Sequence, residues 1–323
     1  MTSSILIHKH IADAIHAANH IVLLTDERID GDTIGSTLGM YHCLREMGKN
    51  VQVFSPSPLV ESLAFLPGVG DIVRDASILN QEDIDLFLIF DCSDGLYLQT
   101  TLPESAKRVP LIVFDHHDTN PRYGTINLVE PESASTADVL WRFIKASGLP
   151  MNKQAAQCIL TGICTDTNTF STGNTTAACL EAAHELSRLG AKLEDIVRHT
   201  MMNKSVATLK LWGLAFERLY HDKTFDALTT AITRKDIETL EVTDNDSKAM
   251  INFLNAMLDD VDVVLVLKES DDGSVKGSFR SHITDVAAKA AAFGGGGHVR
   301  AAGFKVENAR LKEKDGKWEI VRG

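Results

Sequence analysis

The residues best suited to chemistry are an acid and two imidazoles, Asp115, His116 and His117, which follow the apolar run 110–114. A short run of β-branched and aromatic residues predicts a strand. In open parallel sheets, ligands bind at the carboxyl ends of the strands. The sequence therefore predicts a polar site where this strand ends.

Two further apolar runs lead into carboxylates in the same way. The run 21–25 precedes Asp26 and the Asp-Gly-Asp segment 30–32, and the run 86–90 ends at Asp91. An Asp-x-Asp loop alone is about as often a solvated turn, and a lone Asp after a strand is more often a helix N-cap. Their joint occurrence with Asp-His-His favours one shared site.

Such a site is suited to divalent cations. Oxygen ligands with one or two imidazoles fit Mn²⁺ or Mg²⁺ better than a sulfur-seeking ion. Clustered carboxylates repel one another unless cations neutralise them, and two ions about 3.5–4 Å apart are a usual arrangement for phosphoryl chemistry. The sequence therefore predicts a centre with two divalent cations.

Composition narrows the class of protein. A chain of 323 residues with 44% hydrophobic and 24% charged residues is typical of about two globular domains. The net charge of −12 argues against electrostatic capture of long nucleic acid. The five cysteines form no Cys-x-x-Cys pair, no signal peptide is evident, and no apolar run reaches the roughly 18 residues that span a bilayer. We therefore expect a cytoplasmic protein without a membrane partner.

The order of the predicted elements indicates an α/β fold with two domains. Strands and helices alternate over residues 1–190, which predicts a parallel sheet covered by helices. Residues 191–219 are expected to form a helical connector. Residues 220–323 contain strand-like runs and an Asp-Asp-Gly hairpin signal at 271–273, which predict a second, smaller α/β domain.

A glycine run at 294–297, followed by His298, could bind an anion through its backbone N–H groups. A glycine run alone is more often a flexible turn. Arg280 and Ser281, at the end of a predicted strand, could contact a phosphate, with the guanidinium offering a two-pronged contact. An exposed strand-end arginine would be the simpler explanation without the glycine run nearby.

These motifs, taken in order, resemble those of the DHH phosphoesterases, subfamily 1, which combine a DHH and a DHHA1 domain. The matching segments, spread from about residue 20 to 305, are Asp30-Gly-Asp32-x-x-Gly35-Ser36, Asp91, Asp115-His116-His117, Thr165-Asp166-Thr167 and 294–303. The length resembles that of stand-alone oligoribonucleases that also act as 3′-phosphoadenosine-5′-phosphate phosphatases. The resemblance implies a larger parallel-sheet domain and a smaller substrate-binding domain with a cleft between them.

The resemblance also implies a set of metal ligands. Asp30 would bind one ion, Asp32 and His116 the other, with Asp91 bridging both and Asp166 completing the set of ligands around the second ion. The family usually has a His four residues before the first Asp of its Asp-x-Asp motif, and a Pro directly before that Asp. This chain has Asp26 and Ile29 there. Asp26 is therefore expected as a ligand of the first ion, with a shorter reach than an imidazole.

The remaining implied residues act on the substrate. Asp115 would orient an imidazole, and His117 would face the scissile phosphate, with Arg280 assisting electrostatically. The residues expected to hold the substrate's other phosphate or nucleotide are Arg280, Ser281, Gly295, Gly296, Gly297 and His298.

The predicted function is a two-metal phosphoesterase that cleaves short oligonucleotides and 3′,5′-bisphosphate nucleotides to mononucleotides. Mn²⁺ is the expected ion, with Mg²⁺ as the alternative. Cyclic-dinucleotide or polyphosphate and pyrophosphate hydrolysis, and a non-catalytic nucleotide sensor, are the other hypotheses. Long duplex nucleic acid is not an expected partner, and a homodimer is expected only by analogy.

Overall fold

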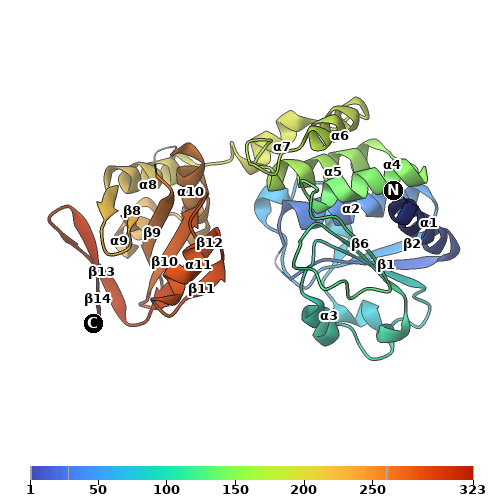
Figure 1. The fold of residues 1–323 in the computed structure, drawn as a ribbon, viewed down its shortest axis with the longest axis horizontal. Coiled ribbons are helices and arrows are strands. Elements are labelled where there is room, and N and C mark those ends of the chain that lie inside the picture. Colours follow the sequence, from blue (N-terminus) through green and yellow to red (C-terminus); the bar gives the residue numbers. More distant parts are fainter. Residues whose placement is uncertain (1, 28, 259–260, 323) are drawn as a thin grey trace. The chain divides into compact units, whose positions relative to one another are not determined.

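The computed structural model describes residues 2–27, 29–258 and 261–322. The chain forms two compact units, 1–203 and 204–323, each with its own sheet (Figure 1). Among the described residues, no helix is both long and apolar enough to cross a membrane.

The sheet of the first unit is parallel throughout, in the order β3-β2-β1-β4-β5-β6. Its strands are β1 His20–Leu24, β2 Asn50–Phe54, β3 Ile72–Val73, β4 Leu86–Phe90, β5 Leu111–Asp115 and β6 Ile126–Val129. Both β1 and β4 are buried along their whole length, which explains why their sequences are continuously apolar. The strand order reverses between β1 and β4, and ligands of such sheets bind at that point.

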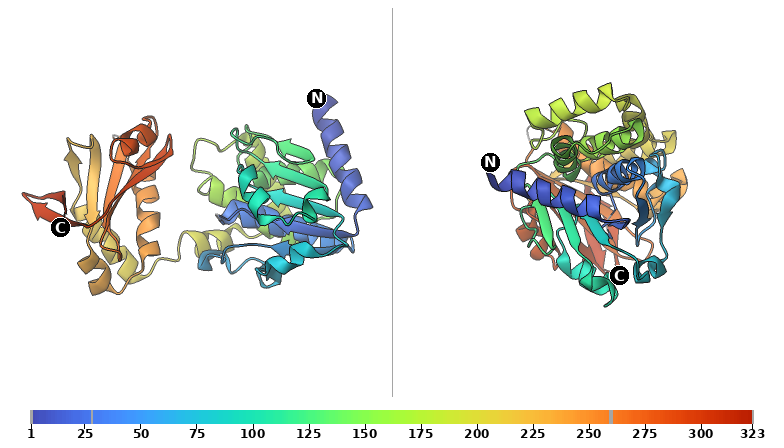
Figure 2. Two further views of the ribbon diagram at one scale, coloured as in Figure 1. Left: turned by 90° about the horizontal axis from the view of Figure 1, so that it is seen from below. Right: turned by 90° about the vertical axis from the view of Figure 1, so that its right-hand side faces the viewer.

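Helices cover both faces of this sheet. Figure 1 shows α1, α2, α4 and α5 on one side and α3 on the other, and the views of Figure 2 show the same layers from two further directions. The bounds are α1 Thr2–Ala17, α2 Gly31–Glu46, α3 Gly95–Thr101, α4 Thr136–Ser147, α5 Lys153–Asp166, α6 Ala177–Arg188 and α7 Leu193–Thr200. Four short 3₁₀ segments, η1 to η4, complete the unit at Glu61–Leu63, Val69–Asp71, Ala76–Asn80 and Ala106–Arg108.

The two faces have separate cores. Ile21, Leu23 and Phe114 point into the larger core with α1, α2, α4, α5 and α6. Val22 and Val113 point into the smaller core beneath α3. This alternation fixes which strand-end side chains can approach α2, α4 and α5.

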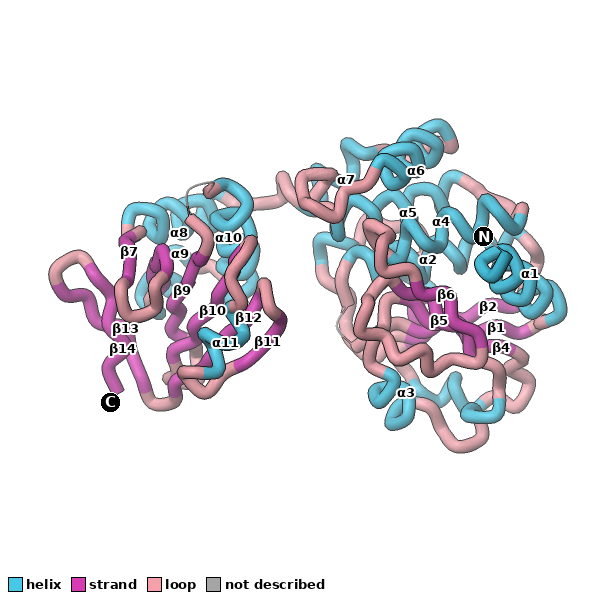
Figure 3. The backbone as a smooth tube through the Cα atoms, viewed as in Figure 1, coloured by secondary structure: helices cyan, strands magenta, loops and turns pink. Residues whose placement is uncertain are grey.

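The second unit, 204–323, has a mixed sheet in the order β11-β12-β10-β9-β8-β7, in which only β8 and β9 pair in parallel (Figure 3). Its strands are β7 Tyr220–Asp222, β8 Ala227–Ile232, β9 Val263–Glu269, β10 Val275–Ser281, β11 Gly296–His298 and β12 Ala301–Val306. Its helices are α8 Val206–Glu217, α9 Arg234–Leu240, α10 Asp244–Met257 and α11 Val286–Ala291. The core under α8, α9 and α10 is distinct from the core under α11.

A separate hairpin, β13 Ala309–Lys314 and β14 Lys317–Arg322, ends the described chain. Its turn residues Asp315 and Gly316 both have positive φ, 52° and 72°, which is the geometry that an Asp-Gly hairpin turn favours. Our prediction from the sequence did not include this hairpin, α9 or α10.

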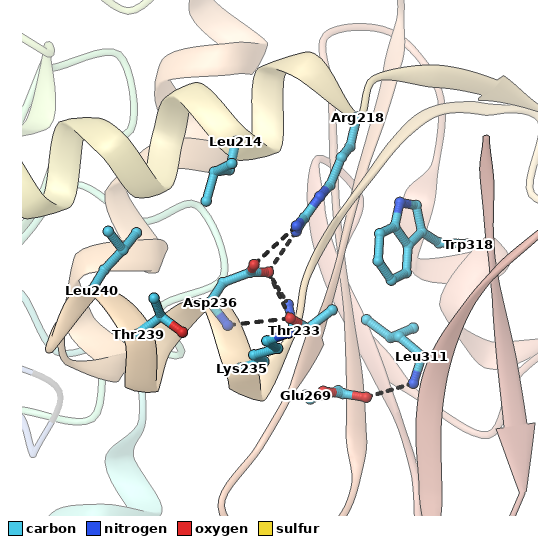
Figure 4. Close-up of a pocket in the computed structure, with 10 residues that line it drawn as sticks. All are labelled: Leu214, Arg218, Thr233, Lys235, Asp236, Thr239, Leu240, Glu269, Leu311 and Trp318. Carbon is cyan, nitrogen blue, oxygen red and sulfur yellow. Dashed lines mark hydrogen bonds and ion pairs between the residues drawn. The ribbon is translucent and has the colours of Figure 1, made fainter.

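A pocket of about 510 Å³ lies where the hairpin meets α8 and α9 (Figure 4). The Arg218 guanidinium donates to both carboxylate oxygens of Asp236, at 2.5 and 2.9 Å, and lies 4.9 Å from the centre of the Trp318 ring. Glu269 accepts the backbone N–H groups of Arg234 and Leu311, each at 2.7 Å. The Leu311–Glu269 bond and the Arg218–Trp318 contact attach the hairpin to the rest of the unit.

Candidate metal centre

The carboxyl ends of β1, β4 and β5 lie side by side, because β4 pairs with β1 on one edge and β5 on the other. Asp91 follows β4 directly, and His116 and His117 follow Asp115, the last residue of β5. The first turn of α2 carries Asp32, and α5 ends at Asp166. The structure thus brings together strand ends that the sequence predicted to share one site.

Five of these side chains form two overlapping groups of ligand atoms, each within 4.8 Å of one another. The groups are Asp91, His116 and His117, and Asp32, His116 and Asp166. His116 belongs to both groups, and its Nε2 atom lies 3.8 Å from Asp91 Oδ1 and 3.7 Å from Asp166 Oδ2. The arrangement offers carboxylate oxygens and imidazole nitrogens at spacings that a divalent cation could draw together.

Asp91 has an unusual backbone conformation. Its φ of 58° places it in the left-handed region, where a non-glycine residue is strained. The Asp91 N–H still bonds the Phe114 carbonyl at 3.0 Å, so the chain turns sharply only after the last β4 pairing. The turn directs the side chain towards α2 and α4. Its carboxylate there accepts hydroxyl hydrogen bonds from Thr33 and Thr136, at 2.8 and 3.0 Å.

Asp32 is buried between α2 and α4. Its two carboxylate oxygens accept the backbone N–H groups of Thr136 at 2.7 Å and Ala137 at 2.9 Å. These are the first free amides of α4, where the helix dipole favours negative charge. Gly162 of α5 packs so closely that a methyl group there would lie 2.9 Å from Asp32 Oδ1 and 2.6 Å from the Ala137 side chain.

The electrostatics of the site fit a cation. Burial, followed by the charge of Asp30, raises the pKa of Asp91 to about 7. Burial, followed by the charges of Asp91 and Asp166, raises the pKa of Asp32 well above its ordinary value, and burial also raises that of Asp166. Three carboxylates that resist ionisation when alone would be stabilised as anions by divalent cations. The residues present therefore fit a metal site.

Asp30 and Asp26 lie outside the two ligand groups. Asp30 is the exposed N-cap of α2, and its Oδ1 accepts the N–H groups of Asp32 and Thr33 at 3.0 Å each. Asp26 is buried just beyond β1. After burial itself, the Asp26 charge is the next cause that raises the pKa of the Cys92 thiol to about 12. Asp26 therefore lies close enough to Cys92, the residue after Asp91, to act on it electrostatically.

Asp115 is fully buried and organises the second histidine. Its Oδ1 accepts the backbone N–H of His116 at 2.8 Å and the Nδ1–H of His117 at 2.7 Å, and its Oδ2 accepts from Asn120 at 2.5 Å. Burial alone would raise the pKa of Asp115, but the bonds from His117 and Asn120 outweigh it and lower the pKa. The bond to Asp115 raises the pKa of His117 to about 9. This shift favours the protonated form of His117 at neutral pH.

The predicted substrate residues lie in the second unit. Arg280, Ala301 and His298 face one another across β10, β12 and β11, so their side chains lie on one face of the sheet. The Arg280 Nε–H donates to Asn252 of α10 at 3.0 Å.

The Ser281 hydroxyl, which the sequence predicted to contact substrate, bonds residues of its own domain in the structure. Its side chain is buried, and its hydroxyl donates to Asp262 at 2.9 Å and accepts the N–H groups of Ile283 and Thr284 at 3.1 and 2.7 Å. These bonds hold the loop after β10, directly beside Arg280.

Packing accounts for two of the predicted glycines. A methyl group at Gly295 would lie 2.1 Å from the Gly303 carbonyl, and one at Gly297 would lie 2.6 Å from the Cα of Ala302. Gly296 has open space around it, and β11 is exposed. Of the three, Gly296 is the one at which a side chain would meet open space.

The sequence did not reveal the residues that support the ligands. These are Thr33, Asn120, Thr136 and Asn174. The small-residue run 133–136 before α4 was a usable signal, because a capped helix N-terminus can hold a carboxylate.

The parallel sheet with acidic strand ends, followed by a second mixed-sheet unit, defines the class of protein. The family model described as "DHH family, N-terminal domain" matches residues 20–163, and the one described as "DHHA1 domain" matches residues 230–315. The chain belongs to the DHH family of phosphoesterases, which confirms the resemblance seen in the motifs.

Particular relatives share most of their length with this chain. The bifunctional oligoribonuclease and PAP phosphatase NrnA of Thermus thermophilus is 29% identical over 314 residues, which cover 94% of this chain and 88% of that protein. The protein of the same name from Bacillus subtilis is 26% identical over 298 residues, covering 88% and 89%. The crystal structure of an exopolyphosphatase-related protein from Bacteroides fragilis superposes with a TM-score of 0.83 at 26% identity, covering 93% of this chain and 90% of that one.

Proposed function

We propose that this chain is a phosphoesterase with two divalent cations, which hydrolyses short oligonucleotides and 3′,5′-bisphosphate nucleotides to mononucleotides. The observation that carries the proposal is the convergence of Asp32, Asp91, His116 and Asp166 in one partly buried site. The names of the NrnA relatives support this substrate class.

The ligands divide between two ions in this proposal. Asp32, His116 and Asp166 would hold one ion, Asp91 would contact both, and Asp30 would contribute to the other. Mn²⁺ is our first choice and Mg²⁺ the alternative, because the donors are oxygens with few nitrogens. Cations bound there supply activation of water and stabilisation of charge on the phosphoryl oxygens. Asp26 stays our proposed extra ligand of the first ion, although it lies outside both ligand groups.

The protein's own contribution centres on His117. Asp115 accepts the Nδ1–H of His117, which leaves the opposite nitrogen, Nε2, to donate a hydrogen bond to a phosphoryl oxygen. The half-exposed side chain, at 44%, is accessible to a substrate. A proton held at this nitrogen would stabilise the negative charge that grows on the phosphoryl group.

The second unit would recognise the rest of the substrate. Arg280 and His298, on one face of the sheet, would bind a second phosphate or a nucleotide, with the exposed Gly296 offering a backbone N–H. The net charge of −12 supports small substrates over long strands. The five cysteines are free and buried, which supports a reducing compartment such as the cytoplasm.

Release of mononucleotides from a 5′-labelled RNA dinucleotide with Mn²⁺, compared with a 24-mer, tests the proposal. A cyclic dinucleotide, a 3′,5′-bisphosphate nucleotide and polyphosphate serve as competing substrates. We expect rapid cleavage of the dinucleotide and the bisphosphate and little attack on the 24-mer. Preference for polyphosphate or the cyclic dinucleotide would replace the substrate assignment, and metal binding without any hydrolysis of these compounds would contradict it.

A further inference from the structure

The segment 133–137, which leads into α4, contacts side chains that converge on the metal centre. The backbone N–H groups of Thr136 and Ala137 hold the two oxygens of Asp32, which lies more than a hundred residues earlier in the chain. The Thr136 hydroxyl donates to Asp91 Oδ1 at 3.0 Å. One residue, Thr136, therefore bonds two predicted ligands through two different groups.

The same segment also contacts His116 and is linked to Asp166 through Asn174. The Ser133 carbonyl lies 3.4 Å from His116 Nδ1, on the opposite side of the ring from the nitrogen that faces Asp91 and Asp166. The Ala134 carbonyl accepts from Asn174 at 2.8 Å, and the same amide group lies 3.4 Å from Asp166 Oδ2. Four ligands from separate elements are thus related to one short stretch of backbone.

A second threonine hydroxyl, that of Thr33, bonds the other carboxylate oxygen of Asp91. The Thr33 hydroxyl lies 2.8 Å from Asp91 Oδ2 and 3.1 Å from Asp30 Oδ1, so its single hydrogen favours Asp91. Each carboxylate oxygen can accept about two hydrogen bonds or metal contacts. A threonine hydroxyl occupies one of these positions on each oxygen of Asp91. The other position on each oxygen is available to a cation. The two hydroxyls therefore fix how Asp91 presents its oxygens.

We propose that Thr136 is a positioning residue for the metal centre, which rests on the function proposed above. Its hydroxyl, together with that of Thr33, orients the Asp91 carboxylate, whose oxygens would bind the divalent cations. Both threonines are buried, at 0% and 1% exposure, so neither is available to contact a substrate. Among the ligand contacts of the segment 133–137, this hydroxyl is the one made by a side chain, so it can be removed without changing the backbone.

The test compares Thr136→Val with Thr136→Ser by titrating the metal-free chain with Mn²⁺ alone, using electron paramagnetic resonance to count free and bound ion. Valine preserves the shape and the backbone N–H to Asp32 but lacks the hydroxyl, whereas serine keeps the hydroxyl. The matched control is Thr37→Val, because Thr37 is a fully buried threonine of α2 whose hydroxyl donates to the Thr33 carbonyl within its own helix. Thr33→Val tests the other side of Asp91.

We expect Thr136→Val to weaken Mn²⁺ binding by about 10- to 100-fold, the range found when residues that orient ligands are replaced. Thr136→Ser should bind within about threefold of the unmodified chain, and Thr37→Val should bind normally. If Thr136→Val does not fold by circular dichroism, Thr136→Ala takes its place, because it lacks the same hydroxyl and is less bulky.

Two results would overturn the proposal. One is normal Mn²⁺ binding by the valine or alanine variant, and the other is a serine variant as weak as the valine variant. Either outcome leaves the proposed function intact, because it concerns metal affinity and no substrate is present. If the unmodified chain binds no Mn²⁺, both the positioning proposal and the two-metal function fail. If it binds Mn²⁺ but cleaves no phosphate ester, only the function fails.

Discussion

Asp115→Asn is the substitution whose consequences the structure defines most closely. Oδ1 of Asp115 accepts three N–H groups, and Oδ2 accepts the Asn120 amide at 2.5 Å. In an asparagine, an NH₂ group takes the place of one of these two oxygens. At Oδ2 it would face the NH₂ of Asn120, donor to donor. Asn120 cannot simply turn over, because it also donates to the Cys92 carbonyl and accepts the Arg122 N–H.

The magnitude follows from the pKa of His117. The rise from 6.5 to about 9 corresponds to about 3.4 kcal/mol at 1.36 kcal/mol per pKa unit. Because the His117 side chain is 44% exposed, solvent screening reduces the effect, and we expect roughly 1–2 kcal/mol. Asp115→Asn should therefore lower the pKa of His117 by about one unit. The unsatisfied amide should also destabilise the fold by about 1–3 kcal/mol.

The assay is a nuclear magnetic resonance titration of ¹³Cε1-labelled histidine in the metal-free chain, with His117→Gln to assign the signal. His117 should remain protonated at pH 7 and lose its proton as the pH rises through about 9. In Asp115→Asn the same signal should titrate at lower pH. A His117 signal that titrates near 6.5 in the unmodified chain, or one that Asp115→Asn leaves unchanged, would refute this account of the Asp-His pair.

Three further expectations follow from particular contacts. Gly35→Ala should lower the free energy of unfolding by about 1–3 kcal/mol, because its methyl group would lie 2.6 Å from the Cys158 carbonyl where α2 crosses α5. The matched control is Gly213→Ala in α8, where the space is open. It should raise the free energy of unfolding in urea by about 0.5–1 kcal/mol. Asp262→Asn should destabilise the second unit at pH 5–7, and the difference should vanish as the pH falls from about 4 to 2. Burial opposes ionisation of Asp262, but hydroxyl and backbone N–H groups lower its pKa to about 2. The stabilisation by the carboxylate is therefore present above the pKa of the unfolded state and is lost below the pKa of the folded state. Thermal unfolding at a series of pH values checks this, and an unchanged gap at pH 2 would contradict it. Arg280→Lys should reduce kcat/KM for a bisphosphate nucleotide by about 10- to 100-fold, because the two-pronged guanidinium is lost, and an unchanged kcat/KM would remove Arg280 from the substrate site.

The strand-end chemistry was predictable because it is local. Strand β4 begins and ends where the apolar run 86–90 predicted, and Asp91, Asp115 and His116 fall at strand ends as expected. The order of motifs then indicated the family, which the family matches confirm. Each of these signals lies within a few residues of sequence.

The supporting contacts were not predictable because they join distant segments. The residues that lead into α4 are small and mostly polar, and nothing in that stretch says that the free N–H groups of the helix meet Asp32. Ser281 looks in sequence like a phosphate contact, but the loop folds its hydroxyl onto Asp262. The helix α10 was not predicted from the sequence, because its mixed polar and apolar residues obscure the helical period.

The central claim is that this partly buried cluster of acids and imidazoles is a metal centre that hydrolyses phosphate esters. Its most direct test measures, side by side, bound Mn²⁺ per chain and cleavage of an RNA dinucleotide for the unmodified chain and for Asp91→Ala. We predict about two ions and rapid cleavage that chelation abolishes in the first, and fewer ions with no cleavage in the second. Full metal-dependent cleavage by Asp91→Ala would contradict the claim.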